Sequence, residues 1–394
     1  MIHTRLATLV ACGSLLFACG ASPDATLNGE TDSGPNPTAD AGTNPNPGSD
    51  AGTNPDSDAG EIPEPPLAPF PDGAVTMAGA SDSGDDDGVR TEARFNNPVN
   101  VLATPDGSVI VADYDNGTVR RIDAEGRVGT LVRQRNFARP FGLVLMPDGT
   151  LYVETDSNDM GNRSYETGTI WRVDMASGEA TPLVRDIGRP RGMAALPDGR
   201  IVLSDPQHHV ISIFNPTTME VTPLAGARGQ EGYTDGSGAD ARFARPYDIV
   251  VRGGVIIVAD QNNHRLRSVA LDGTVTTLAG SGIAATTDGA GEAAAFNQPQ
   301  GLAVDSAGNL YVSEMAGNVV RRVRPDGSVA TIAGDGTSGY RDGDPLSARF
   351  FGLEGIDVSD DGALLFVADG NRGGMDSFHR VRRVVLDAEA LTRR

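Results

Sequence analysis

The stretch RPYDIVVRGGVIIVADQNNHRLRSVALDGTVTTLAG, residues 245–280, decides the fold. It contains the short runs VIIVAD (255–260), HRLRSV (264–269) and VTTLAG (275–280), and an Asp-Gly pair separates the last two. High β-branched content, short length and Asp-Gly turns favour antiparallel strands over helices. We therefore expect one unit of four short strands, the first of which follows Pro246.

This unit recurs along the chain from residue 71 onward. Its landmark positions lie 42–56 residues apart, at Pro98, Pro140, Pro190, Pro246, Pro299 and Leu353. Four strands in a repeat of this length are typical of a propeller blade. The sixth unit lacks a fourth strand, whereas GAVTMAG at 73–79 resembles one and precedes the first unit. The sequence thus predicts an all-β, six-bladed β-propeller over 71–394, closed by its N-terminal strand so that no sheet edge is left free in the ring.

The repeats resemble those of NHL-repeat propellers. The resemblance rests on P-x-G at the first strand, the VAD ending of the second, NHRLR at 263–267 and VTTLAG at the fourth. It covers about four-fifths of the chain and implies the fold. It does not imply one function, because the family includes protein binders, RNA binders, sensor ectodomains and some enzymes.

The N-terminus has the pattern of an export signal. Arg5 precedes an apolar run, Leu6 to Ala18, that is too short to span a bilayer. Leu16-Phe17-Ala18-Cys19 resembles a bacterial lipobox, which implies cleavage after residue 18 and lipidation of Cys19. Leu9-Val10-Ala11-Cys12 also fits the pattern but leaves a shorter apolar run, and ordinary secretion is the other alternative. Gly20 follows Cys19 without an aspartate, so we expect an anchor in the cell envelope, at the outer membrane.

Residues 19–70 are predicted to be a disordered tether behind the lipidated cysteine. Positions 20–70 hold ten prolines, nine acidic residues and no arginine, and DAGTNP recurs within them. Such a segment has almost no apolar surface to bury. The predicted organisation is therefore a signal peptide (1–18), a tether (19–70) and one propeller (71–394).

Overall charge excludes several classes of function. The 394 residues include 53 acidic and 32 basic ones, for a net charge of −21. A nucleic-acid binder is therefore only the weaker alternative, since such proteins usually carry a basic surface. We expect contact with membranes only through the lipid, and a monomer.

Features that recur in most blades are interpreted as architectural. D-G-x4-A-x-F occurs in four interblade loops, where Asp orders the loop and Phe wedges between blades; its starting positions are Asp87, Asp235, Asp288 and Asp342. Paired arginines recur in strand three, and we expect them to be solvated or to form interblade salt bridges. Acids end strand two and are expected to accept hydrogen bonds from loop amides. His208, His264 and His379 are assigned to one repeat position at the start of strand three, so we do not interpret them as a metal set.

Features that do not recur are better candidates for function. At the mouth of the channel, polar residues replace or accompany the P-x-G glycine, and they form the candidate ligand site: Asn100, Arg191, Tyr247, Asp248, Gln300 and Glu354. Two blades also carry long loops between strands two and three, at 156–168 and 370–378. These loops share one face with the interblade loops and predict a recognition surface. Its candidate residues are Asp156, Asn158, Asp159, Met160, Tyr165, Met375 and Phe378.

No catalytic residue is predicted. The chain has no P-loop, G-x-S-x-G or H-E-x-x-H motif, and no cysteine after Cys19. The leading hypothesis is a non-enzymatic envelope module that binds a protein or glycan partner, with no cofactor. The alternative is a metal-dependent hydrolase or lyase at the channel mouth. Some six-bladed propellers that this chain resembles are sugar-lactone hydrolases with a divalent ion, so calcium or another divalent ion at Asn100 and Asp248 stays open.

Overall fold

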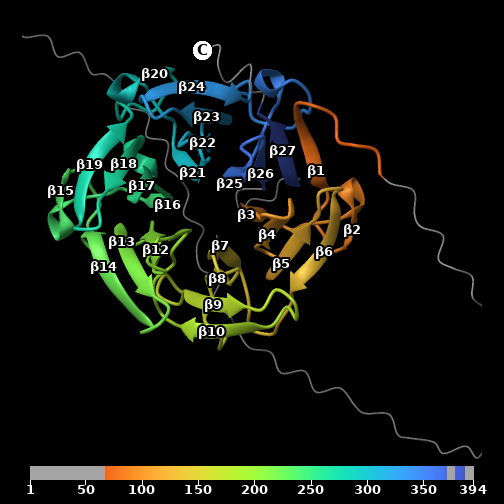
Figure 1. The fold of residues 1–394 in the computed structure, drawn as a ribbon, viewed down its shortest axis with the longest axis horizontal. Helices are drawn as coiled ribbons and strands as arrows, with labels where there is room; N and C mark the ends of the chain where they lie inside the picture. The colour runs from red at the N-terminus through yellow and green to blue at the C-terminus, as the bar shows by residue number, and fades with distance from the viewer. Residues whose placement is uncertain (1–66, 371–377, 387–394) are drawn as a thin grey trace, which may run out of the picture. The chain divides into compact units, whose positions relative to one another are not determined.

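The computed structural model describes residues 67–370 and 378–386, and within them six antiparallel sheets surround one central channel (Figure 1). The predicted export segment with Cys19, most of the predicted tether, and Met375 lie outside these ranges. None of the helices in the described part of the chain is long and apolar enough to cross a membrane.

Each sheet is one blade, with its first strand lining the channel. Blade one contains β3 (Pro98–Ala103), β4 (Val109–Asp113), β5 (Thr118–Ile122) and β6 (Arg127–Val132), plus a short outer strand, β2 (Gly88–Val89). Blade two contains β7 (Pro140–Leu145), β8 (Leu151–Thr155), β9 (Thr169–Val173) and β10 (Ala180–Val184). Blade three contains β11 (Gly192–Ala195), β12 (Ile201–Asp205), β13 (Val210–Asn215) and β14 (Glu220–Gly226).

The other three blades repeat this order. Blade four contains β16 (Pro246–Arg252), β17 (Val255–Asp260), β18 (Arg265–Val269) and β19 (Thr274–Ala279), with outer strand β15 (Gly236–Ser237). Blade five contains β21 (Pro299–Val304), β22 (Leu310–Glu314), β23 (Val319–Val323) and β24 (Ser328–Ala333), with outer strand β20 (Gly289–Ala290). Blade six contains β25 (Leu353–Val358), β26 (Leu364–Asp369), β27 (His379–Val385) and β1 (Ala74–Ala80). Five 3₁₀ turns lie in the loops: η1 (Arg90–Glu92), η2 (Gly238–Asp240), η3 (Gln261–Asn263), η4 (Gly291–Ala293) and η5 (Pro345–Ser347).

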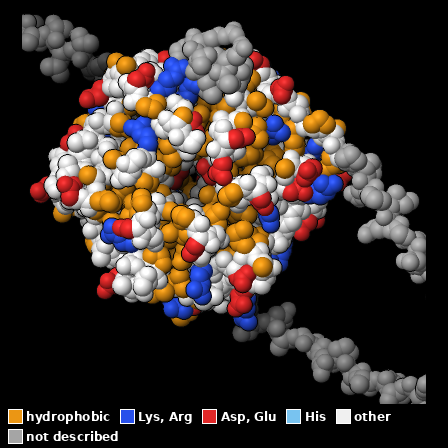
Figure 2. Space-filling model, in the orientation of Figure 1, with side chains coloured by type: hydrophobic (Ala, Val, Ile, Leu, Met, Phe, Trp, Pro, Cys, Tyr) orange, Lys and Arg blue, Asp and Glu red, His pale blue; other side chains and the backbone are white. Residues whose placement is uncertain are grey.

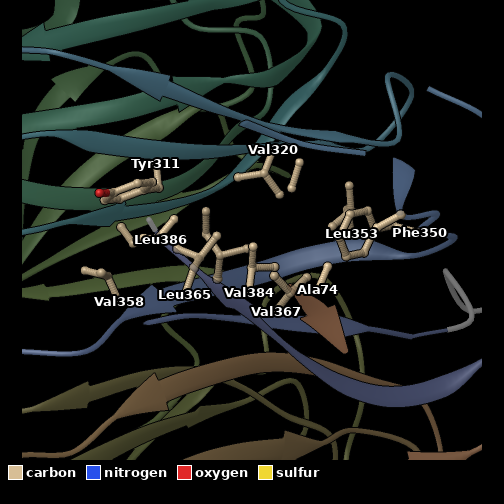
Figure 3. Close-up of a cluster of buried hydrophobic side chains, with 14 residues drawn as sticks. Ala74, Tyr311, Val320, Phe350, Leu353, Val358, Leu365, Val367, Val384 and Leu386 are labelled. Atoms are coloured by element: carbon tan, nitrogen blue, oxygen red, sulfur yellow. The ribbon is translucent and has the colours of Figure 1, made fainter. Parts of the chain in front are cut away.

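The predicted ring closure is confirmed. Strand β1, from the N-terminal end of the described chain, pairs antiparallel with β27, from Ala74 opposite Val384 to Ala80 opposite His379. It supplies the fourth strand that the sixth repeat lacks. Apolar side chains then fill the space between blades, as in the cluster where Tyr311 and Val320 of blade five meet Leu365 and Val384 of blade six (Figure 3).

Four blades carry an arginine clasp, which we define in blade four by Arg267, Asp260, Asp235 and Phe243. Arg267, fully buried, donates to Asp260 at the end of strand two (2.8 Å) and to Asp235 of the preceding D-G loop. Its guanidinium lies 5.3 Å from the ring centre of Phe243, a cation–π arrangement. The equivalent arginines are Arg120, Arg321 and Arg382. The predicted wedging phenylalanines are thereby confirmed. The arginines form salt bridges as expected, but they are buried rather than solvated, and they pair within their own blade and with its entering loop rather than between blades.

Blade two replaces the clasp with a neutral version. Cross-strand pairing puts Trp171 where Arg267 stands in blade four. Its indole N–H donates to the Thr155 hydroxyl (2.7 Å), in place of the arginine–aspartate pair. The ring also packs edge-on against Phe137, with 5.3 Å between ring centres. An aromatic pair and one neutral hydrogen bond therefore fill the same space without buried charge.

Candidate functional site

Bulges at the start of the inner strands shape the channel mouth. The pairing register shifts directly after Pro98, Pro140, Pro246, Pro299 and Leu353. A bulge redirects side chains locally. Asn100, Arg191, Tyr247, Asp248 and Glu354 consequently line one narrow cavity of about 10 Å³, which is the volume of about one water molecule. Gln300, the sixth predicted residue, does not line this cavity; its side-chain oxygen accepts a hydrogen bond from Gln261 (2.9 Å).

The polar side chains of the mouth bind the blades to one another. Asp248 accepts the backbone N–H of Ile249 through one oxygen and that of Leu302 in the next blade through the other, both at 2.8 Å. Asn100 accepts from Val101 (2.9 Å) and donates to the carbonyl of Phe141 in blade two (3.1 Å). In the described residues no three His, Cys, Asp or Glu side chains gather as a metal site. Asn100 and Asp248 are thus each bonded to backbone groups of two blades, and a divalent ion at these residues stays a prediction.

A charged cluster at blades two and three dominates the mouth. Asp156, fully buried, accepts from Arg191 through both oxygens (2.7 and 3.2 Å) and also from Arg189 and the Tyr114 hydroxyl. Burial alone would raise the pKa of Asp156, but Arg191 and Arg189 hold it below its ordinary value. Arg191 also lies 4.0 Å from the ring centre of Phe141. Arg191 is thus held by Asp156 and Phe141 of blade two and lies 5.8 Å from the ring centre of Tyr114 in blade one.

Glu154 belongs to the same cluster, but its pKa is shifted in the opposite direction to that of Asp156. Its carboxyl is fully buried in β8, at the register position of Ala112 in β4 and Ser204 in β12. Burial first, and then the negative charge of Asp156, raise the pKa of Glu154 well above its ordinary value. The pKa values of the two carboxyls are therefore shifted in opposite directions. A single acid at a position held elsewhere by Ala or Ser was the sequence signal for Glu154.

The channel behind the mouth is mainly apolar and contains two acidic side chains. A cavity of about 240 Å³ is lined by inner-strand residues of all six blades, including Asp248 and Asp357. The space-filling view shows the centre of one face hollowed, with acidic side chains at its margin (Figure 2). Asp357 accepts the N–H of Ala103 across the blade six–blade one junction (2.8 Å). It repeats in blade six the bridging role of Asp248 in blade four.

These two carboxyls predict an unusual pH dependence of stability. Burial raises the pKa of Asp248 to about 7 and that of Asp357 to about 6. Because both values exceed the ordinary value of 3.8, the folded protein binds these protons more tightly than the unfolded chain does. Their stabilisation is complete below about pH 4 and is lost as the pH rises through about 6 to 7. We expect Tm to rise when the pH is lowered from 8 to 5.5, measured by calorimetry at fixed ionic strength; a Tm that is flat or falls over this window contradicts the assignment.

The predicted recognition loop of blade two is ordered and partly turned inward. Asp156 and Asn158 are buried, because they face the charged cluster and the loop's own backbone, so their interpretation as outward contacts is wrong. Asp159 forms a salt bridge with Arg185. Met160 and Tyr165 point outward, at 67% and 60% exposure. In blade six, Phe378 stacks on Phe351 with 4.2 Å between ring centres.

The predicted repeat position of His208 is wrong. His209, not His208, holds the repeat position of His264 and His379, because each of these three accepts a backbone N–H of the next interblade loop. His208 instead bonds Asp205 (2.6 Å) and Glu166 of the blade-two loop (3.0 Å). Its bond to Asp205 raises the pKa of His208. Two adjacent histidines in the repeat allowed the misalignment by one residue.

Comparison with known proteins agrees with this architecture. Six four- or five-stranded blades around one channel define a six-bladed β-propeller. No protein-family profile matches the chain. NHL repeat-containing protein 2 of Bos taurus is 24% identical over 345 residues, covering 80% of this chain and 42% of that protein. The chain is therefore a six-bladed β-propeller whose sequence is similar to that of NHL-repeat proteins, and it spans less than half the length of the curated relatives it matches.

Solved structures share the fold at low identity. A protein of unknown function from Bacteroides thetaiotaomicron VPI-5482 has a TM-score of 0.64 and 22% identity, covering 80% of this chain and 76% of that one. An auxiliary nutrient binding protein from Bacteroides ovatus ATCC 8483 has a TM-score of 0.62 and 20% identity, with 79% and 76% covered. These likenesses concern the fold alone.

Proposed function

We propose that this chain is an exported, lipid-anchored binding module that recognises a protein or glycan partner through its long-loop face. The observation that carries the proposal is the loop between β8 and β9. This loop is fixed to blade three by the Thr167–Gly188 bridge and by ion pairs of Glu166 with Arg228 and His208. It nevertheless exposes Met160 and Tyr165. Large apolar groups on a rigid loop bind with a small entropic cost.

The narrow channel mouth supports neither ligand binding nor catalysis, and the proposal therefore rests on the loop face. Its ionised groups pair with one another or with backbone amides, and its cavity of about 10 Å³ has no room for an organic substrate. Structural neighbours of this fold include an auxiliary nutrient binding protein from Bacteroides ovatus, which supports a binding role. The function proposed here is accordingly recognition, without a chemical step.

The binding proposal predicts the effect of a change in the loop. We expect Met160→Asp combined with Tyr165→Ala to reduce partner capture from envelope extract at least tenfold, because an interface loses its central apolar contacts. Capture is measured by cross-linking and quantitative mass spectrometry against the unchanged protein. Leu271→Asp, an equally drastic change at a residue 45% exposed in a hairpin turn, is the matched control. If both variants lose partner capture equally, or if neither variant loses it, the loop is not the recognition surface.

The anchor proposal rests on the sequence around Cys19 and has a separate test. We expect Cys19→Ser to move the protein from the membrane to the soluble fraction, because each acyl CH₂ that is lost removes about 0.8 kcal/mol of membrane binding. Fractionation of cells that express the full chain measures this. Cys12→Ser is the control and should leave the protein at the membrane. A Cys19→Ser protein that stays membrane-bound would show that Cys19 is not the attachment point.

A further inference from the structure

Blade three lacks the clasp that fills the corresponding space in other blades. Cross-strand pairing defines one row per blade, which in blade four is Val258, Arg267 and Thr277. The same row in blade three is Leu203, Ser212 and Pro223. A hydroxymethyl group therefore stands where blade four has a guanidinium and blade two has the Trp171 indole.

The loop that enters blade three is also shortened. In five blades a phenylalanine lies three residues before the first-strand landmark, as Phe243 does before Pro246, whereas Ile187 precedes Pro190. No D-G-x4-A-x-F segment precedes blade three. In blades one, four and five that segment pairs with the outer strand as a short fifth strand. The sheet of blade three has four strands, so among the described residues no fifth strand covers the outer edge of β14.

These omissions leave a pocket of about 570 Å³ on blade three, large enough for a ligand group. Its walls include Ile187, Pro190, Leu203, Ser212, Val221 and Pro223. Asp205 lies at its base but has no acceptor capacity left. One oxygen accepts the N–H groups of Gln207 and His208, and the other accepts the His208 ring and the N–H of Arg189. The pocket consequently suits an apolar group rather than a cation.

The other blades show which group fits such a space. In five of the six blades it holds an aromatic ring, delivered in blades one, four and five by a segment that also pairs as a fifth strand. Among the described residues that line this pocket there is no Phe, Tyr or Trp. The space is therefore free to take a ring from another molecule.

We propose that the blade-three pocket binds an aromatic side chain of a protein partner, presented on an extended segment that pairs with the open edge of β14. Such strand addition supplies backbone hydrogen bonds, while the pocket selects the side chain. This inference rests on the proposed binding function and specifies the partner as a protein. The Glu166–Arg228 ion pair connects the loop of blade two to the rim of the pocket, so the two contact regions adjoin.

The test uses the mature chain and a labelled peptide with the sequence of residues 235–243, DGSGADARF, which delivers the ring in blade four. Fluorescence polarisation should show saturable binding, and the peptide with Phe243→Ala should bind at least tenfold more weakly. Ser212→Trp, which copies Trp171 of blade two, should fill the pocket and abolish binding. Thr276→Trp places the same bulk at an exposed position of β19 in blade four, away from β14 and the pocket, and should leave binding unchanged. Ser212→Leu repeats the test if the tryptophan variant does not fold.

The outcomes separate this inference from the proposed function. Equal binding of both peptides, or binding that persists in a folded Ser212→Trp or Ser212→Leu protein, overturns the pocket proposal. If the peptide fails to bind while Met160→Asp/Tyr165→Ala still abolishes partner capture, the pocket proposal fails and the binding function stands. If sedimentation shows self-association that Ser212→Trp abolishes, the occupant is a second copy, and the proposal of a different partner is wrong.

Discussion

Deletion of residues 71–80 is expected to lower Tm by roughly 10 °C or more, because it removes the strand that closes the ring. Strand β1 buries Val75 and Met77 and pairs along the length of β27. Burying each large apolar side chain contributes about 1.5–3 kcal/mol, and one kcal/mol corresponds to about 2–4 °C in a protein of a few hundred residues. The deletion also frees the blade-six clasp, since Asp342, which pairs with Arg382, accepts the N–H of Thr76 (3.1 Å).

A deletion of equal length in the predicted tether, residues 41–50, is the matched control and should leave Tm unchanged. Both proteins are compared by calorimetry and near-ultraviolet circular dichroism. A synthetic peptide of residues 71–80 should restore part of the lost Tm, because the edge of β27 is then available for pairing. An unchanged Tm in the 71–80 deletion would contradict closure of the ring by β1.

The blades could be predicted from the sequence because each one repeats the same local chemistry. A β-branched run, an Asp-Gly turn and a wedging phenylalanine recur at regular spacing, and GAVTMAG at 73–79 was the one strand-like run without a partner. The recurrence of the arginines in strand three could be recognised for the same reason, whereas their complete burial was not predicted. Repetition distinguishes a residue that supports the architecture from one that does not, and it depends only on local sequence.

The site was harder to predict because its groups meet across blades. In the sequence, Asp357 resembles an ordinary strand residue. In the structure, the pairing register shifts after Leu353, and the Asp357 carboxylate accepts the N–H of Ala103. Glu154 and Arg189 are distant in sequence and meet only at the blade two–blade three junction. The blade-three pocket arises from residues that are missing, and Ser212 and Ile187 become informative only when the cross-strand register fixes what the other blades place there.

Breaking one arginine clasp is expected to be costly, and copying blade two is expected to repair it. Arg267→Ala should lower the free energy of unfolding by about 3–5 kcal/mol, because it leaves Asp260 buried without its charged partner. Burial already raises the pKa of Asp260 to about 6, so its ionised form depends on that partner. Arg267→Trp with Asp260→Thr recreates the pair formed by Trp171 and Thr155. The double variant should therefore be more stable than either Arg267→Trp or Asp260→Thr alone.

Urea unfolding of the wild type, both single variants and the double variant measures this as a thermodynamic cycle. A coupling energy of at least about 1 kcal/mol is expected, since residues in direct contact are not additive. The control combines Arg267→Trp in blade four with Asp113→Thr in blade one. The changes in unfolding free energy of these two substitutions should be additive, because Asp113 pairs with Arg120. If the blade-four pair is also additive, the clasp does not act as a unit. Strong coupling would instead mean that the space between blades accepts either a buried ion pair or an aromatic pair, and that only blade three leaves this space open to an outside ring.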